Sequence, residues 1–294
     1  MRAESWVAAG ALGVVAGAAV RATVSRYHEQ LLLARRPRGP DGIVIGGHAV
    51  SLDASDTRAV LVLHGFGDTP QSVAPVAHAL HIAGWTVRAP LLAGHGRSMR
   101  EMATHGAADW LATARDAYAA LRRSHTHVAL VGQSMGGALA VQLAVEAPPP
   151  GVVLLAPYLQ MPAPIWRTSH LLQLLAPVVP YWTSRTPPRS IHDPAALARA
   201  RAHVATSATA LAELRRVSDG ARAVLPRLAS PTLVLQSRED NRIAPTTAAE
   251  TFARIGAATK RLEWFTGRGH VLAVDYAHDE IAARVIAWLD HPAD

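Results

Sequence analysis

The sequence predicts an α/β domain with a mostly parallel central sheet and helices on both of its faces. Short apolar runs, suited to strands buried on both faces, alternate with longer segments of helical periodicity. The chain has 294 residues, 50% of them hydrophobic, and can therefore bury one substantial core. The alternation is interrupted once, over the proline-rich residues 157–226, and then resumes. We interpret that segment as a helical cap inserted between two strands.

The predicted elements follow one another in a regular order. After a β-hairpin around Gly46 and Gly47, within residues 43–52, the expected strands are 59–63, 85–89, 128–131, 151–156, 232–236 and 261–265. The expected helices of the body are 70–83, 107–123, 138–145, 246–255 and 275–289, and those of the cap are 194–203 and 208–217. The body of the domain thus comprises residues 41–156 and 227–294.

Residues 1–40 contain an apolar segment followed by a linker. Trp6 to Val20 carries no charge over fifteen residues, about 22 Å as a helix against a hydrocarbon core of about 30 Å. A membrane anchor, a cleaved signal peptide ending near Ala16-Gly17-Ala18 and a docked soluble helix all fit this segment. Five arginines follow this segment within eighteen residues, and they favour a membrane anchor that keeps the body on the cytoplasmic face. The alternatives are an exported protein and a soluble cytoplasmic protein.

Composition and charge exclude several kinds of function. The absence of cysteine excludes disulfides, thiol catalysis and cysteine-ligated metal. The net charge of +7 comes from two segments, because residues 1–40 hold six Arg against two Glu and residues 157–226 hold eight Arg against three acidic residues. No basic stripe interleaved with aromatic residues indicates a nucleic-acid partner. The distribution favours an anionic membrane surface, although arginines on solvated helix faces explain it as well.

The central strand ends in a motif with a specific geometry. Residues 128–131 lead into Gly132-Gln133-Ser134-Met135-Gly136, and an alanine-rich helical run follows at once. A strand that turns this sharply into a helix needs Gly132 and Gly136, because a Cβ there would strike the returning helix. The turn lifts the Ser134 hydroxyl above the sheet edge, where it is placed to act as a nucleophile.

A serine nucleophile requires a base and a group that orients the base. In sheets of this kind the acid and then the histidine follow the serine, each in a loop after a later strand. Asp240 lies four residues after strand 232–236, with Glu239 as a competing candidate, and His270 lies between the last strand and the last helix. We therefore predict Ser134, His270 and Asp240 as nucleophile, base and orienting acid.

The reaction also needs N–H donors for the oxyanion. We predict the backbone N–H of Met135, next to the nucleophile, and that of Phe66 in the loop after strand 59–63. His95, which stands between two glycines, is predicted to be a structural hydrogen-bonding residue. This chemistry requires neither a metal nor a cofactor.

From about residue 43 to residue 290 the chain resembles an α/β-hydrolase of the carboxylesterase and monoacylglycerol lipase type. The motifs that carry the resemblance are Leu63-His64-Gly65-Phe66, Pro90-Leu91 with Gly94-His95-Gly96, residues 132–137, residues 231–236 with Asp240, and Gly269-His270-Val271-Leu272 followed by Asp275. Ser237 and Asn241 depart from the glycine and proline that are frequent at these positions, and the N-terminal apolar segment is additional.

The resemblance implies ester hydrolysis, with a helical cap over an apolar acyl tunnel. We predict a serine hydrolase that cleaves carboxylic esters of short to medium or long acyl chains, monoacylglycerol-like lipids above all, through an acyl-enzyme intermediate. A thioesterase, a lysophospholipase or an acyltransferase with the same triad are alternatives. A non-catalytic binding protein of this fold is a more distant one.

Overall fold

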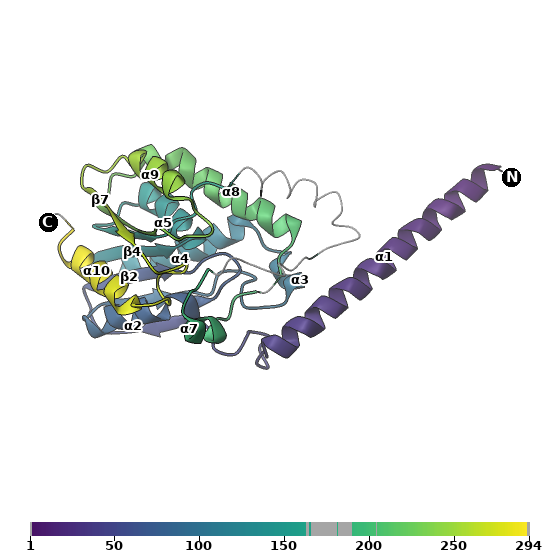
Figure 1. Ribbon diagram of the computed structural model, residues 1–294, viewed down its shortest axis with the longest axis horizontal. Coiled ribbons are helices and arrows are strands. Elements are labelled where there is room, and N and C mark those ends of the chain that lie inside the picture. Colours follow the sequence, from purple (N-terminus) through teal and green to yellow (C-terminus); the bar gives the residue numbers. More distant parts are fainter. Residues whose placement is uncertain (1, 163–164, 166–180, 182–189, 204, 293–294) are drawn as a thin grey trace.

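The computed structural model describes residues 2–162, 165, 181, 190–203 and 205–292, and it confirms the predicted α/β fold. A seven-stranded sheet has the order β1-β3-β2-β4-β5-β6-β7 (Figure 1). Its strands are β1 (Val50–Leu52), β2 (Arg58–Leu63), β3 (Thr86–Ala89), β4 (His127–Gln133), β5 (Val152–Leu155), β6 (Thr232–Ser237) and β7 (Lys260–Phe265). β1 runs antiparallel to β3, and the other neighbouring pairs are parallel.

The central strands are buried on both faces, as their continuous apolar runs predict. Val60 to Leu63 in β2 and Val152 to Leu155 in β5 are fully buried. The parallel register places Leu63 opposite Gly132 and Gln133 opposite Leu155. The carboxyl ends of β2, β4 and β5 therefore meet at one edge of the sheet, where the loops that follow them lie close together.

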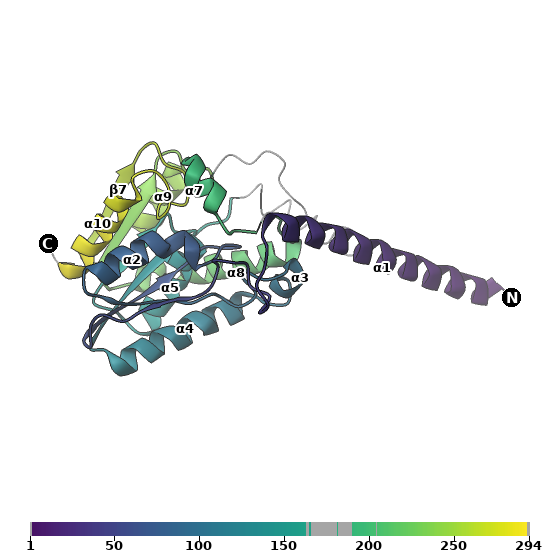
Figure 2. The ribbon, with the colours of Figure 1, turned by 90° about the horizontal axis from the view of Figure 1, so that it is seen from below.

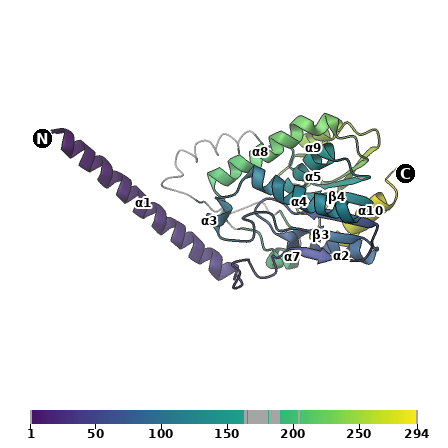
Figure 3. The same cartoon turned by 180° about the vertical axis from the view of Figure 1, so that it is seen from behind.

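Helices cover the two faces of this sheet. The helices of the body are α2 (Ala74–Ile82), α3 (Met99–Met102), α4 (Ala107–Ser124), α5 (Met135–Glu146), α9 (Pro245–Ala253) and α10 (His278–Asp290), with 3₁₀ turns η1 (Pro70–Val73) and η2 (Leu225–Arg227). α2 packs against α10 on one face, whereas α5 packs against α4 and α8 (Ala208–Val224) on the other (Figures 2 and 3).

Part of the segment predicted as a cap packs against a helix that covers the sheet. Residues 163–164, 166–180, 182–189 and 204 of that segment lie outside the described residues. The described part forms α7 (Pro194–Arg199), which ends earlier than predicted, and α8, which continues seven residues beyond the predicted end at Val217. Gln142 Nε2 on α5 donates to Val217 O at 3.2 Å, so α8 is docked on the helix that follows Ser134. The division at residue 226 stays a prediction.

The predicted hairpin within residues 43–52 does not form. Residues 50–52 make one strand, and the preceding residues turn instead, with Gly47 N bonded to Val44 O at 2.8 Å and Gly46 at φ +80°. Val44 is buried and its N–H donates to Gly96 O at 2.7 Å. The prediction was wrong because residues 43–45 pair with residues 37–39 instead, around an isolated antiparallel bridge between Arg38 and Val44, while β1 pairs with β3.

The N-terminal segment forms α1 (Arg2–Arg35), a helix of 34 residues that extends away from the body (Figure 1). None of the helices that the structure describes is both long enough and apolar enough to cross a membrane. Membrane association of α1 stays a prediction.

Candidate active site

Ser134 lies at the sharp turn between β4 and α5, in a conformation that residues with a Cβ rarely adopt. Its φ is 55° and its ψ is −117°. A Cβ on Gly132 would lie 2.3 Å from Gly136 O, and one on Gly136 would lie 2.2 Å from Leu63 O. Both contacts are far shorter than van der Waals separation, so glycine is required at each position for the turn to close. The structure therefore forms the sharp turn that the motif predicts, and we call residues 132–136 the elbow.

The structure brings Ser134, His270 and Asp240 together from distant parts of the chain. His270 Nε2 lies 2.8 Å from Ser134 Oγ, and His270 Nδ1 lies 2.8 Å from Asp240 Oδ2. Because a carboxylate only accepts hydrogen bonds, Nδ1 carries the proton and Nε2 is free to accept the serine hydroxyl proton. The His270 side chain is 8% exposed and that of Asp240 is 0% exposed, so the pair is shielded from water.

Asp240 is held as a carboxylate. Burial alone would raise its pKa, but His270 and the backbone N–H groups of Arg242 and Ile243 outweigh burial and lower it. These N–H groups donate to Oδ1 at 2.7 and 2.9 Å, while Gln236 Nε2 donates to Oδ2 at 2.7 Å. The competing candidate Glu239 accepts instead from Gly267 N at 3.1 Å. Asp240 is thus the acid bonded to His270.

The two predicted oxyanion donors belong to two segments next to Ser134, the start of α5 and the loop after β2. Met135 is the first residue of α5, so its N–H belongs to the helix N-terminus, which favours negative charge. Phe66 follows Gly65, where an added Cβ would lie 3.3 Å from Ser134 Cβ. The loop after β2 therefore approaches the serine closely, and glycine permits that approach.

His64 supports this loop in a way that sequence reasoning missed. Its Nε2 accepts from Leu92 N at 3.1 Å, which leaves the proton on Nδ1 to donate to Gly65 O at 2.9 Å. Complete burial lowers the pKa of His64 to about 4, so the ring stays neutral at physiological pH. Gly65 O and the N–H of Phe66 share one peptide unit, and fixing the oxygen also fixes the direction of that N–H.

His95 is buried beneath the same loop. Its Nδ1 lies 3.1 Å from Ala93 O, and its ring meets the rings of His64 and Trp110 edge-on at centroid distances of 5.1 and 5.3 Å. These contacts agree with the structural role expected for it.

In the part of the chain that the structure describes, no group of three or more His, Cys, Asp or Glu side chains is arranged to hold a metal ion.

A mostly parallel sheet with a serine elbow after its central strand, and an acid and a histidine after later strands, defines an α/β-hydrolase. The chain belongs to the family described as serine aminopeptidase, S33, whose sequence profile matches residues 54–276.

Similar proteins agree with this assignment. The chain is 29% identical over 241 residues to the thermostable monoacylglycerol lipase of Bacillus sp. (strain H-257), an alignment that covers 78% of this chain and 89% of that protein. It is 26% identical over 239 residues to a carboxylesterase of Bacillus subtilis (strain 168), covering 79% and 92%. A solved structure from work on LipS and LipT, two metagenome-derived lipolytic enzymes, has a TM-score of 0.77 at 29% identity and covers 84% of this chain and 99% of its own. The predicted resemblance to carboxylesterases and monoacylglycerol lipases is thereby confirmed.

Proposed function

We propose that the chain hydrolyses carboxylic esters of short to medium or long acyl chains, monoacylglycerol-like lipids in particular, through an acyl-enzyme formed on Ser134. The observation that carries the proposal is the continuous chain of hydrogen bonds from Ser134 Oγ through His270 to Asp240, with 2.8 Å at each step. The similarity to a monoacylglycerol lipase and to a carboxylesterase supports ester substrates of this class.

The geometry suits acyl transfer to water. Ser134 Oγ attacks the ester carbonyl while His270 Nε2 accepts its proton, and Asp240 stabilises the imidazolium that forms. The N–H groups of Phe66 and Met135 donate to the oxyanion. His270 then returns the proton to the departing alcohol, and a water molecule, activated by the same histidine, releases the carboxylic acid and restores Ser134.

The first test is the initial rate of hydrolysis of esters of one alcohol with acyl chains from acetyl to palmitoyl. We expect turnover that Ser134→Ala abolishes, a fall of at least about 10⁴-fold, because that change removes the nucleophile and keeps the fold. A maximum at medium or long chains supports acyl glycerols, and a maximum at acetyl indicates a small pocket. Unchanged turnover in Ser134→Ala would contradict the mechanism, and background rates throughout would favour acyl transfer or binding.

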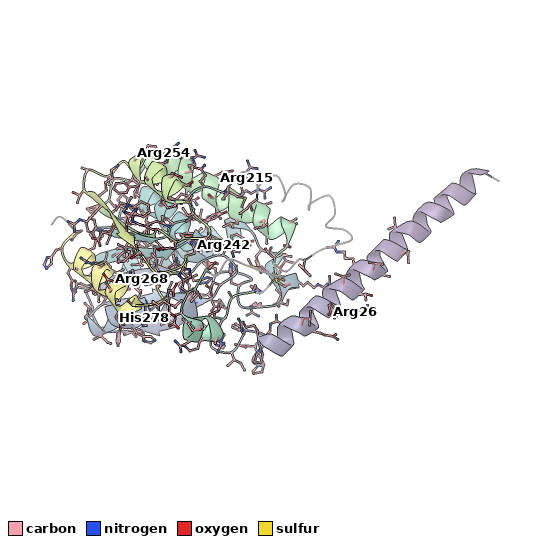
Figure 4. All side chains as sticks on the ribbon, in the orientation of Figure 1. Arg26, Arg215, Arg242, Arg254, Arg268 and His278 are labelled. Carbon is pink, nitrogen blue, oxygen red and sulfur yellow. The ribbon has the colours of Figure 1, made fainter. Side chains whose placement is uncertain are left out.

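We also propose that α1 attaches the protein to an anionic membrane surface on the cytoplasmic face. Val14, Val15 and Val20 on this helix are 74%, 67% and 48% exposed, and Arg21 and Arg26 follow the uncharged stretch. Figure 4 shows Arg26 on the part of α1 that projects from the body. Exposed apolar side chains beside arginines match the chemistry of an anionic lipid interface.

Sedimentation with vesicles tests this attachment. We expect the full chain to bind vesicles containing phosphatidylglycerol, more weakly at high salt, and we expect Arg21→Glu with Arg26→Glu to reduce binding because each arginine contributes about 1 kcal/mol near such a surface. The matched control is Arg122→Glu with Arg123→Glu, at the end of α4 on the body. Binding that ignores salt, anionic lipid and the α1 substitutions would rule out an electrostatic attachment.

A further inference from the structure

Gln133, the residue before Ser134, is buried at the carboxyl end of β4 with 1% of its surface exposed. Its Nε2 donates to two backbone oxygens, Leu155 O and His270 O, each at 3.1 Å. Because both partners can only accept, the NH₂ end of the amide must face them, which fixes the orientation of the side chain. One side chain therefore joins the elbow, the end of β5 and the backbone of His270.

The acceptor on β5, Leu155 O, also binds the backbone of the proposed nucleophile. Ser134 N donates to the same Leu155 O at 2.9 Å. The backbone of Ser134 and the side-chain amide that bonds to His270 are thus fixed to one atom, the carbonyl oxygen at the carboxyl end of β5. This arrangement relates the position of the proposed base directly to that of the proposed nucleophile.

The other bonds of the His270 loop lead away from the elbow. Gly269 N donates to Asp275 Oδ2 at 2.7 Å, and Val271 N donates to Ser190 O at 2.9 Å. His270 O also accepts from Leu272 N at 3.1 Å, a bond internal to the loop. These bonds shape the loop and connect it to residues 190–193. The bond from Gln133, by contrast, connects the backbone of His270 to the elbow.

We propose that Gln133 is a positioning residue that sets the separation of His270 Nε2 and Ser134 Oγ, an inference that rests on the proposed function. The side chain acts through the backbone of His270 and touches none of the reacting atoms. Its loss frees the carbonyl of His270 to move, and a displacement of about 1 Å at a reacting group costs roughly 100-fold in rate.

The test is Gln133→Met, which has nearly the same volume but no hydrogen-bond donor. Hydrolysis of p-nitrophenyl butyrate is measured per active site, with sites counted by stoichiometric labelling with a fluorophosphonate. We expect kcat per site to fall by roughly 10- to 100-fold while KM changes by less than about twofold, because the base and not the substrate pocket is displaced. Counting labelled sites removes any contribution from unfolded protein. If Gln133→Met folds poorly, Gln133→Asn, whose side chain is one methylene shorter, gives a second measurement.

The matched control is Gln142→Met. Gln142 lies on α5, about two turns beyond Ser134, and its Nε2 likewise donates to a backbone oxygen, that of Val217 on α8 and not that of His270. We expect its kcat per site to equal that of the wild type. Equal kcat in wild type and Gln133→Met, or a change confined to KM, overturns the positioning role and leaves the proposed function intact. Failure of the wild type to label or to hydrolyse the ester would instead overturn the proposed function itself.

Discussion

Ser134 occupies a strained backbone conformation that its neighbours stabilise. A non-glycine residue at φ 55° and ψ −117° costs on the order of 1–3 kcal/mol. Four backbone hydrogen bonds hold the turn in place. Ser134 N donates to Leu155 O at 2.9 Å, and Ser134 O accepts from Gly137 N and Tyr158 N at 3.0 Å and from Ala138 N at 3.3 Å. The elbow could be predicted from sequence because sterics dictate glycine at two fixed spacings around the serine.

The polar residues that surround the triad could not be assigned roles in the same way. Gln133 donates to His270 O, and Gln236 donates to the carboxylate of Asp240. No fixed spacing or periodicity marks a neutral amide for such a role. A signal was nevertheless present, because each glutamine stands near the carboxyl end of an otherwise apolar strand. A buried amide at that edge needs a partner, and the partners available there belong to the site.

At the scale of elements, strands were predicted more accurately than helix ends. The buried parallel strands are continuous apolar runs bounded by turn residues, so their limits are visible in the sequence. The ends of α7 and α8 depend on what they pack against, and no local residue records that contact. The expected start of the last helix at residue 275 is three residues early, because the carboxylate of Asp275 binds loop backbone there.

Asp275 joins three segments through backbone bonds. Its fully buried carboxylate accepts from the N–H groups of His192, Asp193, Gly269 and Tyr276 at 2.7–3.0 Å. Burial alone would raise its pKa, but these four donors lower it, so the group is ionised at neutral pH. The loop before His270 and the segment that leads into α7 are therefore held by one side chain.

We expect Asp275→Asn to lower the free energy of unfolding by about 3 kcal/mol, because the new NH₂ group faces N–H donors and leaves buried donors unpaired. Urea unfolding followed by fluorescence measures the change. The control is Asp279→Asn, the same substitution four residues later on a side chain that is 95% exposed, which should alter stability by less than about 0.5 kcal/mol. Equal stabilities of the two variants would show that the buried carboxylate contributes nothing.

At the scale of the whole molecule, burial shifts the pKa of several ionisable groups in the interior toward their neutral forms. Burial lowers the pKa of His64 and of His203 to about 4 and lowers that of His95 well below 6.5. Burial also raises the pKa of Asp68 to about 6. The sequence shows fifteen histidines but not which of them are buried, so this balance became visible only in the structure.

The two kinds of shift act in opposite directions on stability. Between pH 6.5 and 4 the unfolded chain binds protons on the three histidines that the folded protein does not bind, so acidification favours unfolding. Between pH 6 and 3.8 the folded protein binds a proton on Asp68 that the unfolded chain does not, so acidification favours folding. Each of His64, His203 and Asp68 contributes on the order of 3 kcal/mol over its window. Three histidines against one aspartate give a net loss of stability as the pH falls.

We therefore expect the free energy of unfolding to fall by a few kcal/mol from pH 7 to pH 4.5, measured by urea unfolding at several pH values. His203→Gln should make this dependence shallower, because it removes one of the groups that only the unfolded chain protonates. The same substitution at His291, which follows α10 near the end of the chain, should leave the slope unchanged. Stability that stays constant or rises on acidification would mean that these histidines are accessible to protons in the folded protein, and an equal slope in His203→Gln would remove that residue from the balance.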